Sequence, residues 1–249
     1  MLDLCETEHH PHYLVPELRI CATLDQSLNS VLEGMNTASE WTGGQIAEHR
    51  QRFLAGLQVD AENGLSSAMV VDAAVAAFAG KPRLAVDAGA HMFSACAYWP
   101  AAQPRDILIS NGLATMGFAV PAAIAAALHD PERGAIAMTG DGGMLMCMGE
   151  MRTAAQTGAN ICVIVFNDGQ LSLIDIKREE RQMQDLGLSW DRPDFAAAAQ
   201  GFGFNVWRPE TPEELESACT EAASQTGPRL IDAQIDPSGY LLQMKALRG

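Results

Sequence analysis

The stretch GAIAMTGDGGMLMCMGEMRTAAQTGANICVIVFNDGQL, residues 134–171, contains two apolar runs that each end in a polar turn. The first run ends in Thr-Gly-Asp-Gly-Gly and the second in Asn-Asp-Gly, and the residues between them favour a helix. Continuous apolar runs that alternate with helices are typical of a parallel sheet covered on both faces. The stretch is therefore predicted to form a strand, a helix and a second strand parallel to the first.

The same alternation continues on both sides of this stretch. The predicted strands are residues 83–89, 106–110, 134–140, 160–168, 204–208 and 229–236. The predicted helices are residues 67–79, 114–128, 144–157, 192–201 and 211–225. We therefore expect an α/β protein with three layers, α/β/α, around a mostly parallel six-stranded sheet.

The N-terminal part of the chain has a different pattern. Residues 28–57 predict two polar, amphipathic helices with little strand character, and the weakest boundary lies near residues 58–65. The expected organisation is a leader at 1–62, the α/β domain at 63–236 and a C-terminal tail at 237–249.

Composition excludes several classes of partner. The 31 acidic and 16 basic residues give a net charge of −15, which disfavours nucleic acid and anionic membranes. No apolar run reaches the ~20 residues of a membrane span, and the first residues lack the order of a signal peptide, so we expect a cytoplasmic protein. The six cysteines form no CxxC motif and are expected to be reduced. His9, His10 and His12 are interpreted as a solvated terminus rather than a metal cluster.

Polar residues at two strand ends predict a metal–phosphate site. Gly140, Gly142 and Gly143 allow a sharp turn and leave backbone N–H groups at a helix N-terminus, where phosphate binds well. Asp141 would repel a bare phosphate, so it predicts a bridging cation such as Mg²⁺. Asp168, 27 residues later at the next strand end, is the candidate second ligand. Each turn alone would be a common structural feature, but their joint occurrence favours the site.

The motifs resemble a known superfamily. GLATMGFAVPAAIAAAL (112–128) and GDGGMLMCMGEMRTAAQTGANICVIVFNDGQL (140–171) resemble the diphosphate-binding (PP) domain of thiamin diphosphate-dependent enzymes. The similar members are acetolactate synthases, pyruvate oxidases and 2-oxoacid decarboxylases. The resemblance runs from about 66 to 236 and is most specific over 110–175. Residues 13–60 resemble the tail of the superfamily's middle domain and the linker after it.

The resemblance implies thiamin diphosphate and Mg²⁺ as cofactors. The metal ligands would be the side chains of Asp141 and Asp168 and the backbone carbonyl of Gln170. Many members have Asn in place of Asp168, so this site carries one more negative charge. Met116 would force the bent shape of the cofactor, and the carbonyl of Ala114, where relatives often have Gly, would meet the aminopyrimidine. The implied cofactor-binding residues are Ala90, His91, Ala114, Met116, Gly140, Asp141, Gly142, Gly143, Asp168, Gln170, Leu171, Ser172 and Leu173.

Two positions carry open alternatives. His91 matches a loop on the diphosphate side, and the alternative is a hydrogen-bonded histidine at a strand end. The segment KREERQM, 177–183, is interpreted as a solvated helix face, with a role in substrate access as the alternative.

The resemblance also implies that the site is incomplete. In the superfamily, a glutamate that activates the pyrimidine ring belongs to a separate pyrimidine-binding domain, so no catalytic residue is expected in this chain. We expect a split enzyme whose partner chain carries that domain, in a hetero-oligomer such as a heterotetramer. A truncated piece of a longer chain is the alternative, and the start at Met1 and the end at Gly249 favour the split enzyme.

The expected activity follows from the acetolactate synthase-like motif ATMGFAVPAAI. It would be decarboxylation of a small 2-oxo acid and transfer of the acyl anion to a carbonyl acceptor, a carboligation. One alternative is a simple 2-oxoacid decarboxylase, of the sulfopyruvate or phosphonopyruvate β-subunit type. A non-catalytic interaction subunit is the other, and the presence of Asp141 and Asp168 argues against it.

Overall fold

The computed structural model describes residues 2–3, 20–35, 40–59, 61–184 and 187–248. By their contacts the chain divides into two compact units, residues 1–49 and 50–249. Cys5, His9, His10 and His12 lie outside the described residues. The boundaries expected at 62/63 and 236/237 stay a prediction.

The first unit contains β1 (Leu2–Asp3), β2 (Ile20–Cys21), α1 (Leu24–Gly34) and the beginning of α2 (Gly43–Leu57). Helix α1 starts with a capping box, in which the side chains of Thr23 and Gln26 each accept the other residue's backbone N–H. The two helices expected within residues 28–57 are thus present as α1 and α2.

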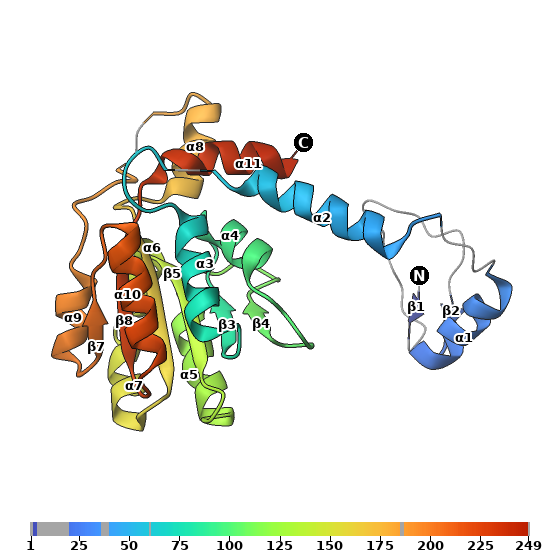
Figure 1. Cartoon of the computed structure of the whole chain (residues 1–249), viewed down its shortest axis with the longest axis horizontal. Coiled ribbons are helices and arrows are strands. Elements are labelled where there is room, and N and C mark those ends of the chain that lie inside the picture. Colours follow the sequence, from blue (N-terminus) through green and yellow to red (C-terminus); the bar gives the residue numbers. More distant parts are fainter. Residues whose placement is uncertain (1, 4–19, 36–39, 60, 185–186, 249) are drawn as a thin grey trace. The chain divides into compact units, whose positions relative to one another are not determined.

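The second unit is built on a six-stranded sheet in which all strands are parallel (Figure 1). Its order is β4-β3-β5-β6-β8-β7. The strands are β3 (Arg83–Val86), β4 (Ile107–Ile109), β5 (Ala135–Gly140), β6 (Ile161–Asn167), β7 (Asn205–Trp207) and β8 (Arg229–Gln234). Every residue of the central strand β6 is buried, because helices cover both faces. The expected three-layer fold is confirmed.

Two apolar clusters fill the space between the sheet and its helices. One cluster packs under α3 (Ser67–Phe78), α4 (His91–Tyr98) and α10 (Pro212–Ala223). The other packs under α5 (Ala119–His129), α6 (Asp141–Cys147), α7 (Glu150–Thr157) and α9 (Phe195–Gly201). Two further helices, α8 (Ser172–Glu180) and α11 (Tyr240–Arg248), follow β6 and β8 respectively.

The helices predicted at 114–128 and 144–157 differ most from the structure, and α4 and α11 were not predicted. The helix expected at 114–128 begins only at Ala119. Gly117 has φ +75°, which a right-handed helix does not allow, so the helix cannot include it. The helix expected at 144–157 begins at Asp141 and is split into α6 and α7 near Gly149. Asp141 therefore belongs to the first helical turn rather than to a loop.

The sheet order has one switch point. From β3 the chain continues to β4, which lies on one side of β3. It then crosses over β3 to form β5 and β6, which lie on the other side of β3. In open parallel sheets, ligands bind at the carboxyl ends of the strands beside such a switch. No helix among the described residues is long and apolar enough to span a membrane.

Candidate cofactor and metal site

A cavity of about 250 Å³ lies at the carboxyl ends of β3, β4, β5 and β6, at the switch point. All thirteen residues expected at the site line it. The residues of this cavity that sequence reasoning missed are Ala88, Gly89, Phe166, Ile174, Lys177 and Tyr240. The structure therefore brings residues from four strand ends to one place.

Asp141 is buried at the start of α6. Its Oδ1 accepts the N–H of Gly142 at 2.8 Å, and its Oδ2 accepts the N–H of Gly169 at 2.9 Å. Burial raises the pKa of Asp141 to about 6, although the hydrogen bonds from Gly142 and Gly169 lower it. The second of these bonds ties the turn after β5 to the turn after β6.

Asp168 follows β6 directly and is half-buried. Its Oδ1 accepts the N–H of Gln170 at 3.1 Å, and its Oδ2 accepts the hydroxyl of Ser172. Burial and the neighbouring charge of Asp141 raise the pKa of Asp168 to about 7. The charge of Asp141 thus makes ionisation of Asp168 less favourable, and a cation bound by both carboxylates would stabilise their ionised forms.

The backbone around Gln170 determines where its carbonyl points. Gln170 pairs with Ser189 in an isolated antiparallel bridge. The hydrogen bonds of that bridge run from Trp190 N to Gly169 O (2.8 Å) and from Leu171 N to Leu188 O (2.9 Å). In such a pair the opposed residues direct their own N–H and C=O groups away from the partner strand. The Gln170 carbonyl is therefore directed away from residues 188–190.

The donor set fits Mg²⁺. Among the described residues no group of three or more His, Cys, Asp or Glu side chains could hold a metal ion. A cation bound by Asp141 and Asp168 would therefore take its other ligands from a backbone carbonyl, water and phosphate oxygens. Mg²⁺ characteristically binds through one or two carboxylates completed by such ligands.

Gly142 and Gly143 of the first turn have different roles. A Cβ on Gly142 would lie 2.7 Å from Leu171 Cδ2 and 3.0 Å from Met116 Cε, so glycine allows both side chains to reach the cavity. A Cβ on Gly143 would lie 2.6 Å from Thr139 Oγ1 and would overlap the carboxylate of Asp87. Gly143 is therefore required for packing, whereas the sequence suggested only a contact with phosphate.

Asp87, at the end of β3, is a buried residue that sequence reasoning missed. Its carboxylate accepts the N–H groups of Gly117 (3.0 Å), Phe118 (2.7 Å) and Ala119 (2.6 Å), and the hydroxyl of Thr139 (2.6 Å). It thus caps helix α5, which has no side-chain cap of its own. The sequence held one sign of this contact: no Ser, Thr, Asp or Asn stands directly before Ala119, so the cap of α5 had to come from elsewhere in the chain.

Ala114 and Met116 occupy the loop that this cap holds. Ala114 has φ +49°, in the left-handed region, which costs a residue with a Cβ roughly 1–2 kcal/mol. Glycine adopts this conformation freely. The loop therefore needs a left-handed backbone at residue 114, and the methyl group of alanine is not needed for it. Both residues line the cavity.

His91 is buried at the start of α4 and stacks on Phe166, with ring centroids 5.1 Å apart. Burial lowers the pKa of His91 to about 4 despite the opposing charge of Asp87. Its imidazole is therefore neutral at pH 7, and its Nε2 has no hydrogen-bond partner among the described residues. A buried polar atom without a partner beside a cavity is consistent with a missing ligand.

Two further side chains complete the lining. Lys177, in the segment interpreted as a solvated helix face, is half-buried and lines the cavity. Its charge is complementary to an anionic ligand. Tyr240, from the predicted tail, is also buried at the cavity. Its distance in sequence from the motifs explains why no local pattern indicated it.

Comparison with known proteins gives a consistent result. Residues 87–233 match the family described as "Thiamine pyrophosphate enzyme, C-terminal TPP binding domain". The chain is 32% identical to the acetolactate synthase large subunit of Haemophilus influenzae over 203 residues, which cover 78% of this chain and 34% of that protein. It is 28% identical to the acetolactate synthase isozyme 1 large subunit of Escherichia coli over 231 residues, 89% of this chain and 40% of that protein. The chain thus spans well under half the length of these relatives.

Proposed function

Because the chain belongs to the thiamine pyrophosphate enzyme family, we propose that it binds the diphosphate end of thiamin diphosphate through Mg²⁺ as part of an acetolactate synthase-like enzyme. The observation that supports this most strongly is the meeting of Asp141, Asp168 and Gln170 at one cavity. They come from the ends of two neighbouring strands, β5 and β6, and Asp141 is followed by the two glycines of the first turn of α6.

In this proposal Mg²⁺ is held by the carboxylates of Asp141 and Asp168 and by the carbonyl of Gln170. The diphosphate lies against the first turns of two helices, α6 and α8, which both begin at the cavity. The N–H of Gly142 donates to Oδ1 of Asp141. The other backbone N–H groups of a helix's first turn have no backbone partner within the helix and favour anions. The charge of Lys177 adds to this attraction.

The remaining residues shape the other end of the cavity. Met116 would support the cofactor in a bent shape, and the carbonyl of Ala114 would accept a hydrogen bond from the aminopyrimidine; both residues line the cavity. Phe166, Leu171 and Met116 exclude water, which strengthens the electrostatic interactions inside. Thiamin diphosphate, when bound, supplies a nucleophilic carbon and an electron sink for the loss of CO₂ from a 2-oxo acid.

We further propose that the group that activates the pyrimidine ring comes from a partner chain. No glutamate is among the described residues that line the cavity. The relatives are about two and a half to three times as long as the matched region, so this chain covers only part of what they contain. The enzyme would then be a hetero-oligomer, and the active site would be complete only when both chains are present.

The proposed reaction is carboligation: decarboxylation of a small 2-oxo acid and transfer of the acyl anion to a carbonyl acceptor. The names of the relatives, acetolactate synthases, favour this over simple decarboxylation, which is the second candidate. A cytoplasmic location stays a prediction from composition.

The test is reconstitution. The chain alone, given thiamin diphosphate and Mg²⁺, should show almost no turnover of 2-oxo acids. Addition of the protein that carries the pyrimidine-binding domain should restore turnover, and the neighbouring reading frames are the first place to look for it. Product analysis then separates carboligation from decarboxylation. Full activity of the isolated chain would contradict the shared site.

A further inference from the structure

The turn that carries Asp168 is held by a distant part of the chain. We call residues 167–171 the metal turn and residues 188–195, which run beside it, the clasp. Two backbone hydrogen bonds join them, Trp190 N to Gly169 O and Leu171 N to Leu188 O. Gly169 has φ +77°, and a Cβ there would lie 2.9 Å from Trp190 O. The clasp is thus packed against the backbone of the metal turn.

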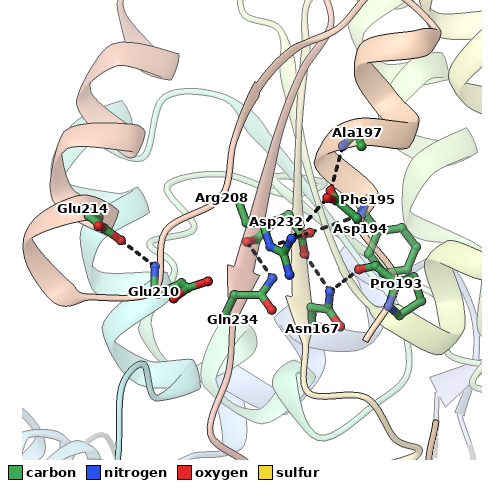
Figure 2. Close-up of polar contacts among 10 residues, drawn as sticks. All are labelled: Asn167, Pro193, Asp194, Phe195, Ala197, Arg208, Glu210, Glu214, Asp232 and Gln234. Atoms are coloured by element: carbon green, nitrogen blue, oxygen red, sulfur yellow. Dashed lines mark hydrogen bonds and ion pairs between the residues drawn. The ribbon is translucent and has the colours of Figure 1, made fainter. Parts of the chain in front are cut away.

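Asn167 connects this pair of segments to the sheet (Figure 2). Its buried side-chain amide donates to the carbonyl of Pro193 in the clasp at 2.9 Å and to Oδ1 of Asp232 on β8 at 2.9 Å. Both neighbours are acceptors, so the NH₂ group must face them and the amide has only one orientation. Asn167 also directly precedes Asp168, the proposed metal ligand.

Asp232 is the point at which these contacts meet. It is fully buried, and its second oxygen, Oδ2, accepts the N–H of Phe195 at 3.2 Å, at the end of the clasp. The guanidinium of Arg208, with Nε at 3.9 Å from Oδ2, partly balances its charge. One carboxylate therefore holds the metal turn through Asn167 and the clasp through Phe195 (Figure 2).

We propose that Asn167 and Asp232 are positioning residues for the metal site, and this rests on the proposed function. They fix the metal turn between β8 and the clasp, so that the Asp168 carboxylate and the Gln170 carbonyl are in place before the metal binds. Neither residue lines the cavity. They would therefore influence metal binding through the positions of Asp168 and Gln170 and not by contact with the metal. Residues that orient metal ligands typically contribute about 10- to 100-fold to metal affinity.

The most informative variant is Asp232→Asn. It keeps the shape of the side chain, but its single carbonyl oxygen can accept from Asn167 or from Phe195, not from both. Asn167→Ala, which removes both amide hydrogen bonds, is the second variant. The matched control is Asp194→Asn: Asp194 also forms an ion pair with Arg208, at 3.2 Å, and caps α9 at Ala197 N. The amide of Asn167 donates to Pro193 and Asp232, not to Asp194. Asn is an equally good N-cap.

The experiment measures Mn²⁺ binding to the full chain by electron paramagnetic resonance, with thiamin diphosphate present. Asp232→Asn and Asn167→Ala should weaken Mn²⁺ binding about 10- to 100-fold, whereas Asp194→Asn should bind as the wild type does. Hydrogen exchange, which needs no metal, should become faster in Asp232→Asn at residues 167–171 and 188–195 and stay unchanged elsewhere in the sheet.

Unchanged Mn²⁺ affinity in both variants would overturn the positioning role while leaving the proposed function intact. Faster exchange across the whole sheet in both variants would also overturn it, because the role would then be global stability. If the wild-type chain with thiamin diphosphate bound no Mn²⁺, the proposed function itself would fail, and this inference with it.

Discussion

The carboxylate of Asp87 occupies the space that a side chain on Gly143 would need. Asp87 directly follows β3 and Gly143 lies in the first turn of α6, so this contact joins two of the strand ends that form the cavity. Because the same carboxylate caps α5, the loop with Ala114 and Met116 depends on it as well. The third glycine of the Gly-Asp-Gly-Gly turn is thus explained by a contact within the protein.

Gly143→Ala should destabilise the protein. The new methyl group would overlap Asp87 and approach Thr139, and overpacking of this kind typically costs about 1–3 kcal/mol. Denaturant unfolding measures the change. The matched control is Gly149→Ala, since a Cβ there meets nothing within 4 Å and φ is −58°. Equal stability of the two variants would contradict the packing role of Gly143.

Asp87→Asn should destabilise the protein and disorder the loop before α5. An amide has one acceptor oxygen where the carboxylate has two, and hydrogen bonds to charged groups contribute about 1.5–3 kcal/mol each. Asp72→Asn, at an exposed position on α3, is the control for replacing an aspartate with asparagine. If both variants unfold at the same denaturant concentration as the wild type, Asp87 is not the cap of α5.

Ala114→Gly should stabilise the protein slightly, by up to about 1 kcal/mol, because the left-handed backbone strains alanine and not glycine. In contrast, Ala125→Gly in the exposed face of α5 should cost about 1 kcal/mol. Thermal unfolding of the two variants should therefore shift in opposite directions. A loss of stability in both would show that residue 114 carries no strain.

The sequence predicted the strands well because each is a continuous apolar run bounded by polar turns. Strand-end reasoning brought the residues of the Gly-Asp-Gly-Gly turn and Asp168 to one edge of the sheet, because parallel strands place their carboxyl ends together. The other expected cavity residues came from the resemblance to the superfamily. The sequence failed where the signal is not local. Asp87 caps a helix that starts 32 residues later, and Tyr240 reaches the cavity from a helix after the last strand. Asp141 was placed before its helix because the glycines that follow it have a low helix propensity and indicated a turn.

The account depends above all on Asp141 and the metal. Calorimetry of thiamin diphosphate binding to the full chain, with and without Mg²⁺, tests it most directly. Asp191→Ala, an exposed aspartate beside Trp190, is the control for loss of a charge.

Wild type and Asp191→Ala should bind the cofactor much more tightly with Mg²⁺ than without it. Asp141→Ala should lose this dependence, with affinity reduced about 100-fold or more, since loss of a ligand exceeds the 10- to 100-fold cost of losing an outer partner. Unchanged, Mg²⁺-dependent affinity in Asp141→Ala would contradict the proposed site.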